Sequence, residues 1–249
     1  PLEQLNEEER KEAVIIVPDV FFRFYDATTL EATIQLLHKL GITLFLAPYK
    51  PSGKAQHVLG YLDQFRESAQ KQHNLLTKLA RYQFPLVGIE PPVTLIYRDE
   101  YRKKLNLPTP EVALIQSCLL KFLSNEPERI AALSLDPKLS KQTYQLLSHC
   151  TEKSNATTAP TEWQQLFALI GVTLTLGRVG CCGMSGAFGH LKAQEELSRK
   201  LYHQSWKNVI DREPAEQLLA TGSPCRSKVE RFSHEKLQHP LTLLKRVIQ

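Results

Sequence analysis

Several common features are missing from this chain of 249 residues. It contains no run of about 18 apolar residues, the length that spans a bilayer, so we expect no transmembrane segment. The N-terminus has no signal-peptide pattern, and five cysteines are an odd number that is too small for a secreted disulfide scaffold. We therefore expect a cytoplasmic protein.

An excess of one charge is also missing. The formal net charge is only +5, and bases alternate with acids along the chain, as in residues 7–12. This pattern indicates a solvated surface rather than a basic stripe, so we expect no nucleic-acid binding. Methionine is nearly absent: the chain begins at Pro1 and holds a single methionine, Met184. We interpret the chain as a segment of a longer polypeptide.

Short β-branched runs alternate with longer stretches of helical periodicity. We predict strands at residues 14–17, 43–46, 86–89, 144–147, 173–176 and 218–220. We predict helices at residues 27–40, 58–80, 110–123, 161–170, 191–204, 226–232 and 241–247. Strands separated by helices form βαβ units, so the predicted fold class is α/β with mostly parallel sheets.

The alternation occurs twice, and the two halves can be overlaid. The aligned pairs, each close behind a predicted strand, are Asp19 with Cys150, Gly53 with Gly183, and Pro92 with Cys225. We interpret this as an internal duplication, with chance similarity between two βαβ units as the alternative. It predicts two pseudo-repeated lobes. Residues 1–130 form a degenerate lobe without cysteine ligands, and residues 131–249 form the lobe with the cysteine site.

Four of the five cysteines lie close behind predicted strands. They are Cys150, Cys181, Cys182 and Cys225. Loops at the carboxyl ends of parallel strands meet at one edge of the sheet, so we expect these thiols to converge at that edge of the second lobe. Four converging thiols indicate a metal or cluster site. The fifth, Cys118, lies on the apolar face of a predicted helix and is interpreted as a core residue.

Cys181 and Cys182 are adjacent and are followed by a glycine-rich turn. At the start of a helix neighbouring side chains point about 100° apart, so this pair suits two irons of a cluster better than one zinc ion. Gly183, Ser185 and Gly186 are the candidate cofactor-binding residues. Their turn would offer an anionic cluster backbone N–H donors and the positive end of the following helix. The cations placed to offset the remaining charge are Lys153, Arg178 and Arg226.

Other interpretations stay open at this point. A zinc-stabilised or metal-free docking module would have no redox role. The vicinal pair alone could form a disulfide or a redox dithiol. Residues 183–187 are also one position away from the nucleophile elbow Gly-x-Ser-x-Gly, with Ser185 as the nucleophile, but the adjacent cysteines have no purpose in a hydrolase.

Three stretches carry a resemblance to a known family: HCTEK at 149–153, GCCGMSGAFGH at 180–190 and ATGSPCRS at 220–227. Together they resemble the cysteine-rich CCG domain of heterodisulfide reductase subunits and of the iron–sulfur parts of FAD-linked glycolate, D-lactate and glycerol-3-phosphate dehydrogenases. They resemble most the C-terminal region of large single-chain flavin dehydrogenases that act on D-2-hydroxyacids, of the D-lactate or D-2-hydroxyglutarate type. In one respect the chain departs from the pattern: the usual final Cys-x-x-Cys is reduced to Cys225, with Ser223 nearby.

The resemblance implies an oxidoreductase in which the four cysteines hold an iron–sulfur cluster of the [4Fe-4S] type, with zinc as the alternative metal. It implies that FAD and a ferredoxin-like domain lie elsewhere in the same polypeptide, and that electrons pass from the flavin to a downstream acceptor. Any membrane association would come through that acceptor. This segment alone is not expected to be catalytic.

Overall fold

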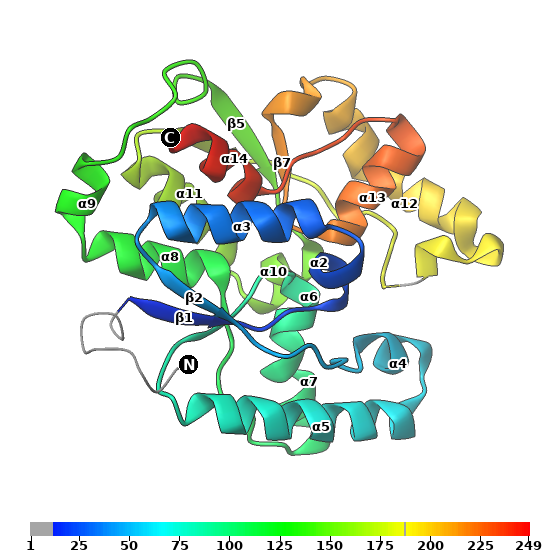
Figure 1. Cartoon of the computed structure of the whole chain (residues 1–249). Helices are drawn as coiled ribbons and strands as arrows, with labels where there is room; N and C mark the ends of the chain where they lie inside the picture. The colour runs from blue at the N-terminus through cyan, green and yellow to red at the C-terminus, as the bar shows by residue number, and fades with distance from the viewer. Residues whose placement is uncertain (1–11, 187) are drawn as a thin grey trace. The chain divides into compact units, whose positions relative to one another are not determined.

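The computed structural model describes residues 12–186 and 188–249 (Figure 1). The chain divides into two compact units, with the boundary between Cys118 and Leu119. We call residues up to Cys118 unit 1 and residues from Leu119 unit 2. The boundary lies inside helix α8 (Ile115–Ser124), upstream of the lobe boundary that the sequence places after residue 130. Each unit contains its own parallel sheet, which confirms the predicted α/β class.

The sheet of unit 1 has four strands in the order β2-β1-β3-β4, all parallel. Its centre is β1 (Ala13–Ile16), which is apolar at every position and buried on both faces. The other strands are β2 (Thr43–Leu46), β3 (Leu86–Gly88) and β4 (Ala113–Leu114). The sequence pattern missed β4 because two residues are too few to show a period.

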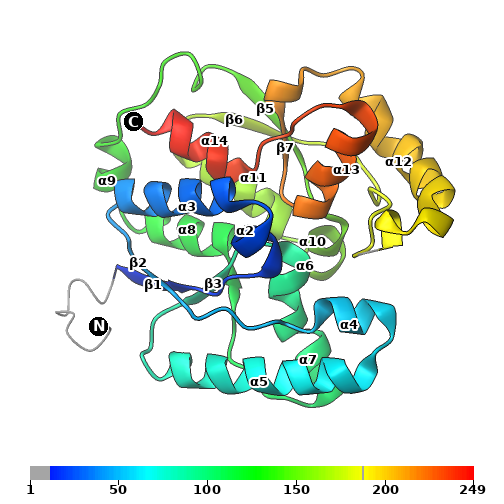
Figure 2. The same ribbon diagram turned by 45° about the vertical axis from the view of Figure 1, so that its right-hand side comes forward.

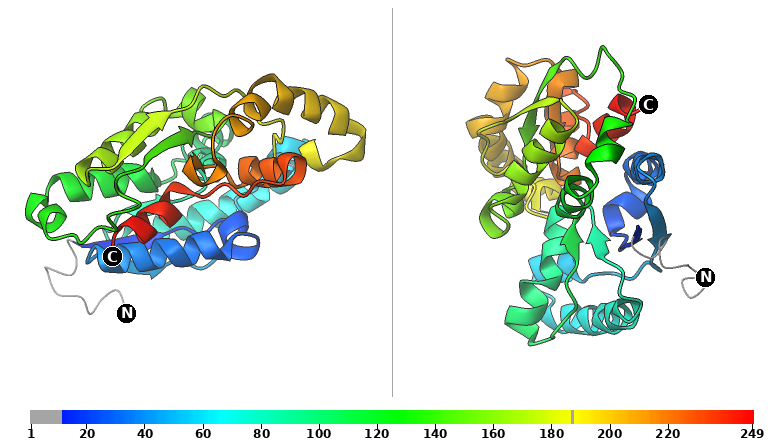
Figure 3. Two further views of the ribbon diagram at one scale, coloured as in Figure 1. Left: turned by 90° about the horizontal axis from the view of Figure 1, so that it is seen from above. Right: turned by 90° about the vertical axis from the view of Figure 1, so that its left-hand side faces the viewer.

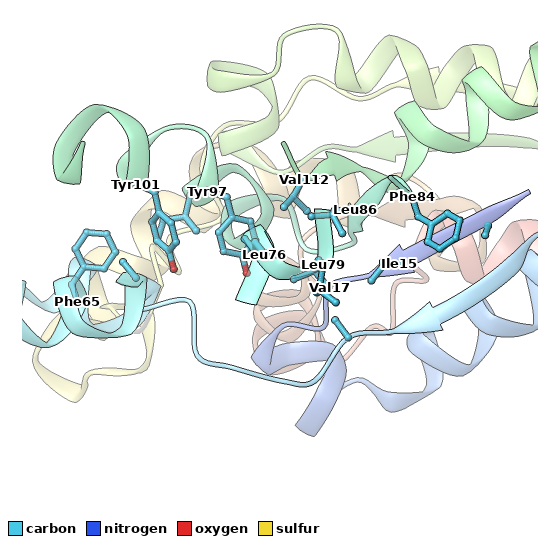
Figure 4. Packing of buried hydrophobic residues seen from close by; sticks show 14 residues of the cluster. Ile15, Val17, Phe65, Leu76, Leu79, Phe84, Leu86, Tyr97, Tyr101 and Val112 are labelled. Atoms are coloured by element: carbon cyan, nitrogen blue, oxygen red, sulfur yellow. The ribbon is translucent and has the colours of Figure 1, made fainter. Parts of the chain in front are cut away.

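Helices connect these strands as βαβ crossovers. They are α2 (Val20–Phe24), α3 (Ala27–Lys39), α4 (Lys54–Leu59), α5 (Leu62–Ala80), α6 (Pro91–Thr94), the 3₁₀ turn η2 (Leu95–Tyr97) and α7 (Glu100–Leu105). The single helix expected over residues 58–80 is two helices, because Gly60 ends α4 with a left-handed φ of 81°. The apolar face of α5 packs against β3, and Tyr101 of α7 packs on Phe65 of α5; Leu76 and Tyr101 are fully buried (Figure 4).

The sheet of unit 2 has three parallel strands in the order β6-β5-β7. These strands are β5 (Thr143–Leu147), β6 (Thr173–Leu176) and β7 (Leu218–Ala220). In both units the first strand is central, the second pairs on one side and the third on the other. The two βαβ lobes therefore share one strand order, and all six predicted strands are present.

The helices of unit 2 are α9 (Pro127–Ala131), α10 (Cys150–Asn155), α11 (Ala159–Leu169), α12 (Glu195–Ile210), α13 (Ser223–Ser233) and α14 (Pro240–Val247), with 3₁₀ turns η3 (Phe188–His190), η4 (Lys192–Gln194) and η5 (Ala215–Gln217). Helices α12 and α13 lie side by side (Figures 1 and 2), and α11 lies against β6 (Figure 3). The helix expected at 191–204 begins and ends later, after two short 3₁₀ turns. In the described part of the chain, no helix combines the length and apolar character needed to cross a membrane.

Candidate functional site

The four predicted thiols meet in unit 2 at the carboxyl edge of the sheet. Cys150 is the first residue of α10 after β5, and Cys225 lies in the first turn of α13 after β7. Cys181 and Cys182 lie in an irregular segment after β6. Thiol hydrogen bonds link Cys150 to Cys181, Cys181 to Cys182, and Cys182 to Cys225. All four are free thiols, and the remaining cysteine, Cys118, belongs to α8.

The protons are shared unevenly among these thiols. The thiols of Cys150 and Cys182 donate to Cys181, which lowers the pKa of Cys181 below its ordinary value. The backbone N–H of Gly183 also donates to the Cys181 sulfur, at 3.3 Å. The pKa values of Cys150 and Cys182 are raised by their hydrogen bonds to neighbouring sulfurs and by burial. The site therefore favours an anionic sulfur at Cys181 that two other thiols stabilise.

A buried polar network joins the ends of β5 and β7 and fixes Cys150. His149 caps α10, and its Nδ1 accepts the N–H of Thr151 at 3.1 Å. The N–H of His149 donates both to the Glu152 carboxylate and to the Thr221 hydroxyl, each at 3.0 Å. The Thr221 hydroxyl in turn donates to Glu152. Because Thr221 directly follows β7, this network places the start of α10 beside the start of α13.

Glu152 is fully buried, and burial raises its pKa to about 7. It completes a capping box with His149, a pattern that sequence reasoning missed although an acid at the third helical position is its usual signal. Gly222 lets the two helix starts approach closely. A Cβ there would lie 2.5 Å from Cδ2 of His149 and 3.1 Å from the sulfur of Cys225.

Helix α12 holds the segment that carries the vicinal pair. The indole N–H of Trp206 donates to the Gly180 carbonyl at 3.1 Å, and the Ser205 hydroxyl accepts the Gly180 N–H at 2.9 Å. Gly183 has a left-handed φ of 84°, and its carbonyl accepts the Ser198 hydroxyl at 2.7 Å. A side chain at Gly183 would overlap the backbone of α12, since a Cβ would lie 2.4 Å from the Ser198 carbonyl oxygen.

Some sequence-based details of the site are wrong. Cys181 and Cys182 do not begin a helix, and the next α-helix after the turn, α12, begins only at Glu195. Its positive end therefore does not lie next in sequence to the glycine turn.

Lys153 donates to the Val179 carbonyl, and Arg226 to the carbonyls of Ala220 at 2.7 Å and Thr221 at 3.1 Å. These two cations thus hold the backbone around the thiols.

The N–H donors to sulfur come from the first residues of the turn. Gly183 donates to Cys181 and Met184 to Cys182, and the second donor was missed because a methionine carries no signal for it. Ser185 and Gly186 lie exposed further along the turn, and their part in cofactor binding stays a prediction. Within residues 12–186 and 188–249, no group of three or more Cys, His, Asp or Glu side chains is arranged to hold a metal ion. The ligand roles of the four cysteines therefore also stay predictions.

No protein-family model matches the chain. A D-2-hydroxyglutarate dehydrogenase of Pseudomonas putida is 38% identical over 244 residues, which are 98% of this chain and 23% of that protein. The chain is similar to D-2-hydroxyglutarate dehydrogenases. The enzyme of that name from Escherichia coli is 36% identical over 250 residues, which are 100% of this chain and 24% of its own length.

The chain thus spans about a quarter of the length of these D-2-hydroxyglutarate dehydrogenases, in their C-terminal part. A more distant relative is one subunit of the anaerobic glycerol-3-phosphate dehydrogenase of Escherichia coli, which is 23% identical over 213 residues, 85% of this chain and 53% of that protein. Of the two hydroxyacid types that the sequence left open, the relatives carry the D-2-hydroxyglutarate name. The assignment to the CCG domain stays a prediction.

Proposed function

We propose that this chain is the electron-transfer part of an FAD-linked D-2-hydroxyacid dehydrogenase of the D-2-hydroxyglutarate type. In this proposal Cys150, Cys181, Cys182 and Cys225 hold an iron–sulfur cluster of the [4Fe-4S] type. The observation that carries the proposal is the meeting of four free thiols, from three strand ends, at one edge of the unit 2 sheet. Similarity over the whole chain to D-2-hydroxyglutarate dehydrogenases supports the reaction class.

The donor set fits an anionic cluster chemically. Four sulfurs are available, one of them already inclined to the thiolate form, and thiolates are the ligands that iron–sulfur clusters prefer. Backbone N–H groups of Gly183 and Met184 point at sulfur, and such donors raise a reduction potential by stabilising the more negative state. A bound cluster would supply one-electron acceptance and release. The protein's part is to hold the sulfurs and to set that potential.

In this proposal the FAD and substrate sites belong to a part of the full-length protein that corresponds to the unmatched part of the relatives. There FAD would accept two electrons from the hydroxyacid, whose C–OH carbon becomes the 2-oxo carbon with loss of two protons. A ferredoxin-like domain and the cluster of this chain would pass the electrons singly to a downstream acceptor. The cytoplasmic location and the acceptor belong to the proposal as well.

The test is the metal content of the full-length protein purified without oxygen. Wild type is compared with Cys182→Ser, and Cys118→Ser is the matched control because Cys118 lies on α8, in no thiol hydrogen bond of the site. We expect iron and acid-labile sulfide in near-equal amounts in wild type and Cys118→Ser, and their loss in Cys182→Ser. One zinc per chain would instead support the docking module. A wild type with neither metal would overturn the proposal.

A further inference from the structure

Exposed apolar side chains gather in two short segments of unit 1. Single exposed apolar residues are normal on any protein surface, whereas a group of them marks an interaction site. Helix α2 buries only Phe22 of its five residues, and α4 buries none of its six. The exposed large apolar residues of these helices and of the turn into α5 are Val20, Phe24, Tyr25, Val58, Leu59, Tyr61 and Leu62. Phe24 is 61% exposed, Tyr25 80% and Tyr61 57%.

Both segments lie at the carboxyl edge of the unit 1 sheet. Helix α2 follows β1 and α4 follows β2, and these two parallel strands are paired along their whole length. Figures 1 and 2 show α2 and α4 beyond the same ends of the two strands. Phe24 also packs edge-on against Tyr49, which lies between β2 and α4, with the ring centres 5.2 Å apart. We call residues 20–25 and 46–62 the edge surface.

The edge surface stands on a rigid base. The Asp19 carboxylate caps α2 and accepts the N–H groups of Phe21 at 2.8 Å and Phe22 at 3.2 Å. Beyond β2, the Tyr101 hydroxyl donates to the Ser52 carbonyl at 2.6 Å, just before the turn that begins α4. Exposed rings held in this way lose little conformational entropy when they bind a partner. The edge surface is therefore organised in advance for docking.

The exposed charges of the edge surface have one sign. It contains no Asp or Glu, whereas its residues Arg23 and Lys50 are exposed. The acids that directly follow its two segments already have partners, because Asp26 caps α3 and Asp63 forms an ion pair with Arg66 at 2.9 Å. Complementary surfaces place opposite charges around an apolar centre. We therefore expect a partner that presents apolar side chains with carboxylates at the rim.

The length of the related proteins indicates where this partner lies. The chain is matched over nearly its whole length, but it spans only 23% and 24% of two D-2-hydroxyglutarate dehydrogenases. About three quarters of such a protein thus lies outside this structure. Two surfaces of one polypeptide meet at an effective concentration of the order of millimolar, so they dock without the high affinity that a separate partner needs. Linkage therefore favours a surface of the same polypeptide over a second copy.

We propose that the edge surface docks the upstream part of the same polypeptide, through an apolar face rimmed by carboxylates. The upstream part is the one that corresponds to the unmatched, N-terminal part of the relatives. Phe24, Tyr25 and Tyr61 are the central contacts, since they expose the largest rings. Thiols do not compete for this edge, because the single cysteine of unit 1, Cys118, lies on α8.

The docking also has a consequence for electron transfer. In the proposed function the upstream part bears the FAD, so the edge surface would hold the flavin-bearing part on the electron-transfer part. This consequence rests on the proposed function, whereas the docking itself does not.

Photo-crosslinking in the full-length protein identifies the occupant. The photoreactive residue p-benzoylphenylalanine replaces Tyr25 in one variant and Tyr61 in a second. A third variant carries it in place of Glu67 and is the matched control, because Glu67 is 67% exposed but lies outside the edge surface, on α5. After irradiation, peptide mass spectrometry identifies the crosslinked segment, and gel electrophoresis separates products within one chain from products between chains.

We expect positions 25 and 61 both to crosslink to peptides of the upstream part within one chain, and position 67 to give little product. Phe24→Asp should lower the yield at position 61 by about tenfold or more, because an unpaired charge at the apolar centre adds to the loss of a central ring. Ile34→Asp is the control for this change and should leave the yield unchanged, since Ile34 is an exposed apolar residue of α3 outside the edge surface. Urea unfolding followed by circular dichroism verifies that both variants keep their fold.

Other products would overturn the proposal. Crosslinks to unit 2 would assign the edge surface to the other half of this chain, and crosslinks between chains would assign it to a second copy. Absence of a peptide product at either position would mean a surface open to water or lipid, and equal yields at position 67 would mean contact without a specific site.

Iron and acid-labile sulfide are measured in the same preparations, so the two proposals can fail separately. Crosslinks to the upstream part in a wild type without iron would refute the proposed function and leave the docking intact. A wild type that holds iron and sulfide but crosslinks elsewhere would refute the docking and leave the proposed function intact.

Discussion

Replacement of Gly183 by alanine isolates the contact that holds the cysteine turn on α12. Gly183 has a φ of 84°, a left-handed conformation that costs a residue with a Cβ about 1–2 kcal/mol. Its Cβ would also lie 2.4 Å from the Ser198 carbonyl oxygen. That oxygen belongs to the backbone of a helix of 16 residues, so it cannot move aside as a flexible side chain would.

A matched position separates the two effects. Gly171 has a similar φ of 73°, but a Cβ there meets nothing within 4 Å. Gly171→Ala should therefore cost only the conformational term, about 1 kcal/mol after the lower entropy of the unfolded alanine chain is counted. Gly183→Ala adds about 1–3 kcal/mol for the steric overlap and about 1 kcal/mol for the strained Ser198 hydrogen bond, a total of about 3–5 kcal/mol.

Urea unfolding followed by tryptophan fluorescence measures this difference. The two tryptophans of the chain, Trp163 and Trp206, both lie in unit 2, so the signal follows the unit that contains both glycines. In the same preparations iron binding should fall in Gly183→Ala and stay at the wild-type level in Gly171→Ala. Equal losses of stability in the two variants would refute the argument that the turn is held by close backbone approach.

Two further predictions concern protonation. In the metal-free protein, donation from neighbouring thiols lowers the pKa of Cys181, so its alkylation rate should stay nearly flat from pH 7 to about pH 5, whereas an ordinary thiol loses about tenfold per pH unit. Peptide mass spectrometry gives the rate at each cysteine, and a tenfold loss per unit at Cys181 would contradict the thiol network. In unit 1, burial raises the pKa of Asp19 from 3.8 to about 6, so the folded protein binds this proton more tightly than the unfolded chain. The contribution of Asp19 to stability should therefore fall by up to about 3 kcal/mol as pH rises from 4 to 6. Asp19→Asn should remove this part of the slope in urea unfolding followed by circular dichroism, while Glu152, whose pKa burial raises to about 7, keeps its own part.

The elements that the sequence predicted well are those with a long apolar period. All six expected strands and the amphipathic helices are present, because burial of one face leaves a repeating pattern. Short elements such as β4, with two residues, and α2, with five, were missed since they are too short to repeat a period. The break at Gly60 was missed because a single glycine is tolerated inside a helix. The sequence does not show that the chain turns at this glycine.

For the site, spacing after parallel strands was sufficient to bring four thiols together, because strand topology alone determines where such loops meet. The residues that support the thiols were not predictable in this way. Glu152, Thr221 and Ser198 act through contacts between segments that are up to 72 positions apart, as in the bond from His149 to Thr221. Polar contacts of this kind leave no periodic signal, and their residue types are ordinary on any helix or loop.

The two units differ most in what lies behind the glycine turn. In unit 1, Gly53 has the same left-handed conformation as Gly183, but a Cβ there would meet the Phe65 ring at 2.7 Å. Behind this turn lies a packed group of aromatic rings, in which Tyr101 contacts both Phe65 and Tyr97 (Figure 4). The Tyr101 hydroxyl donates to the backbone carbonyl of Ser52 at 2.6 Å, so this turn is stabilised by apolar packing and a neutral hydrogen bond.

In unit 2 the corresponding turn is held by polar contacts, in which the Ser198 hydroxyl donates to the Gly183 carbonyl and accepts from the Lys228 ammonium. Apolar packing involves no charge, whereas the buried Lys228 ammonium depends on its hydrogen bond to Ser198 and its contact with the Phe232 ring. The turn after the vicinal cysteines therefore rests on polar groups of α12 and α13, whereas the Gly53 turn rests on aromatic rings of α5 and α7.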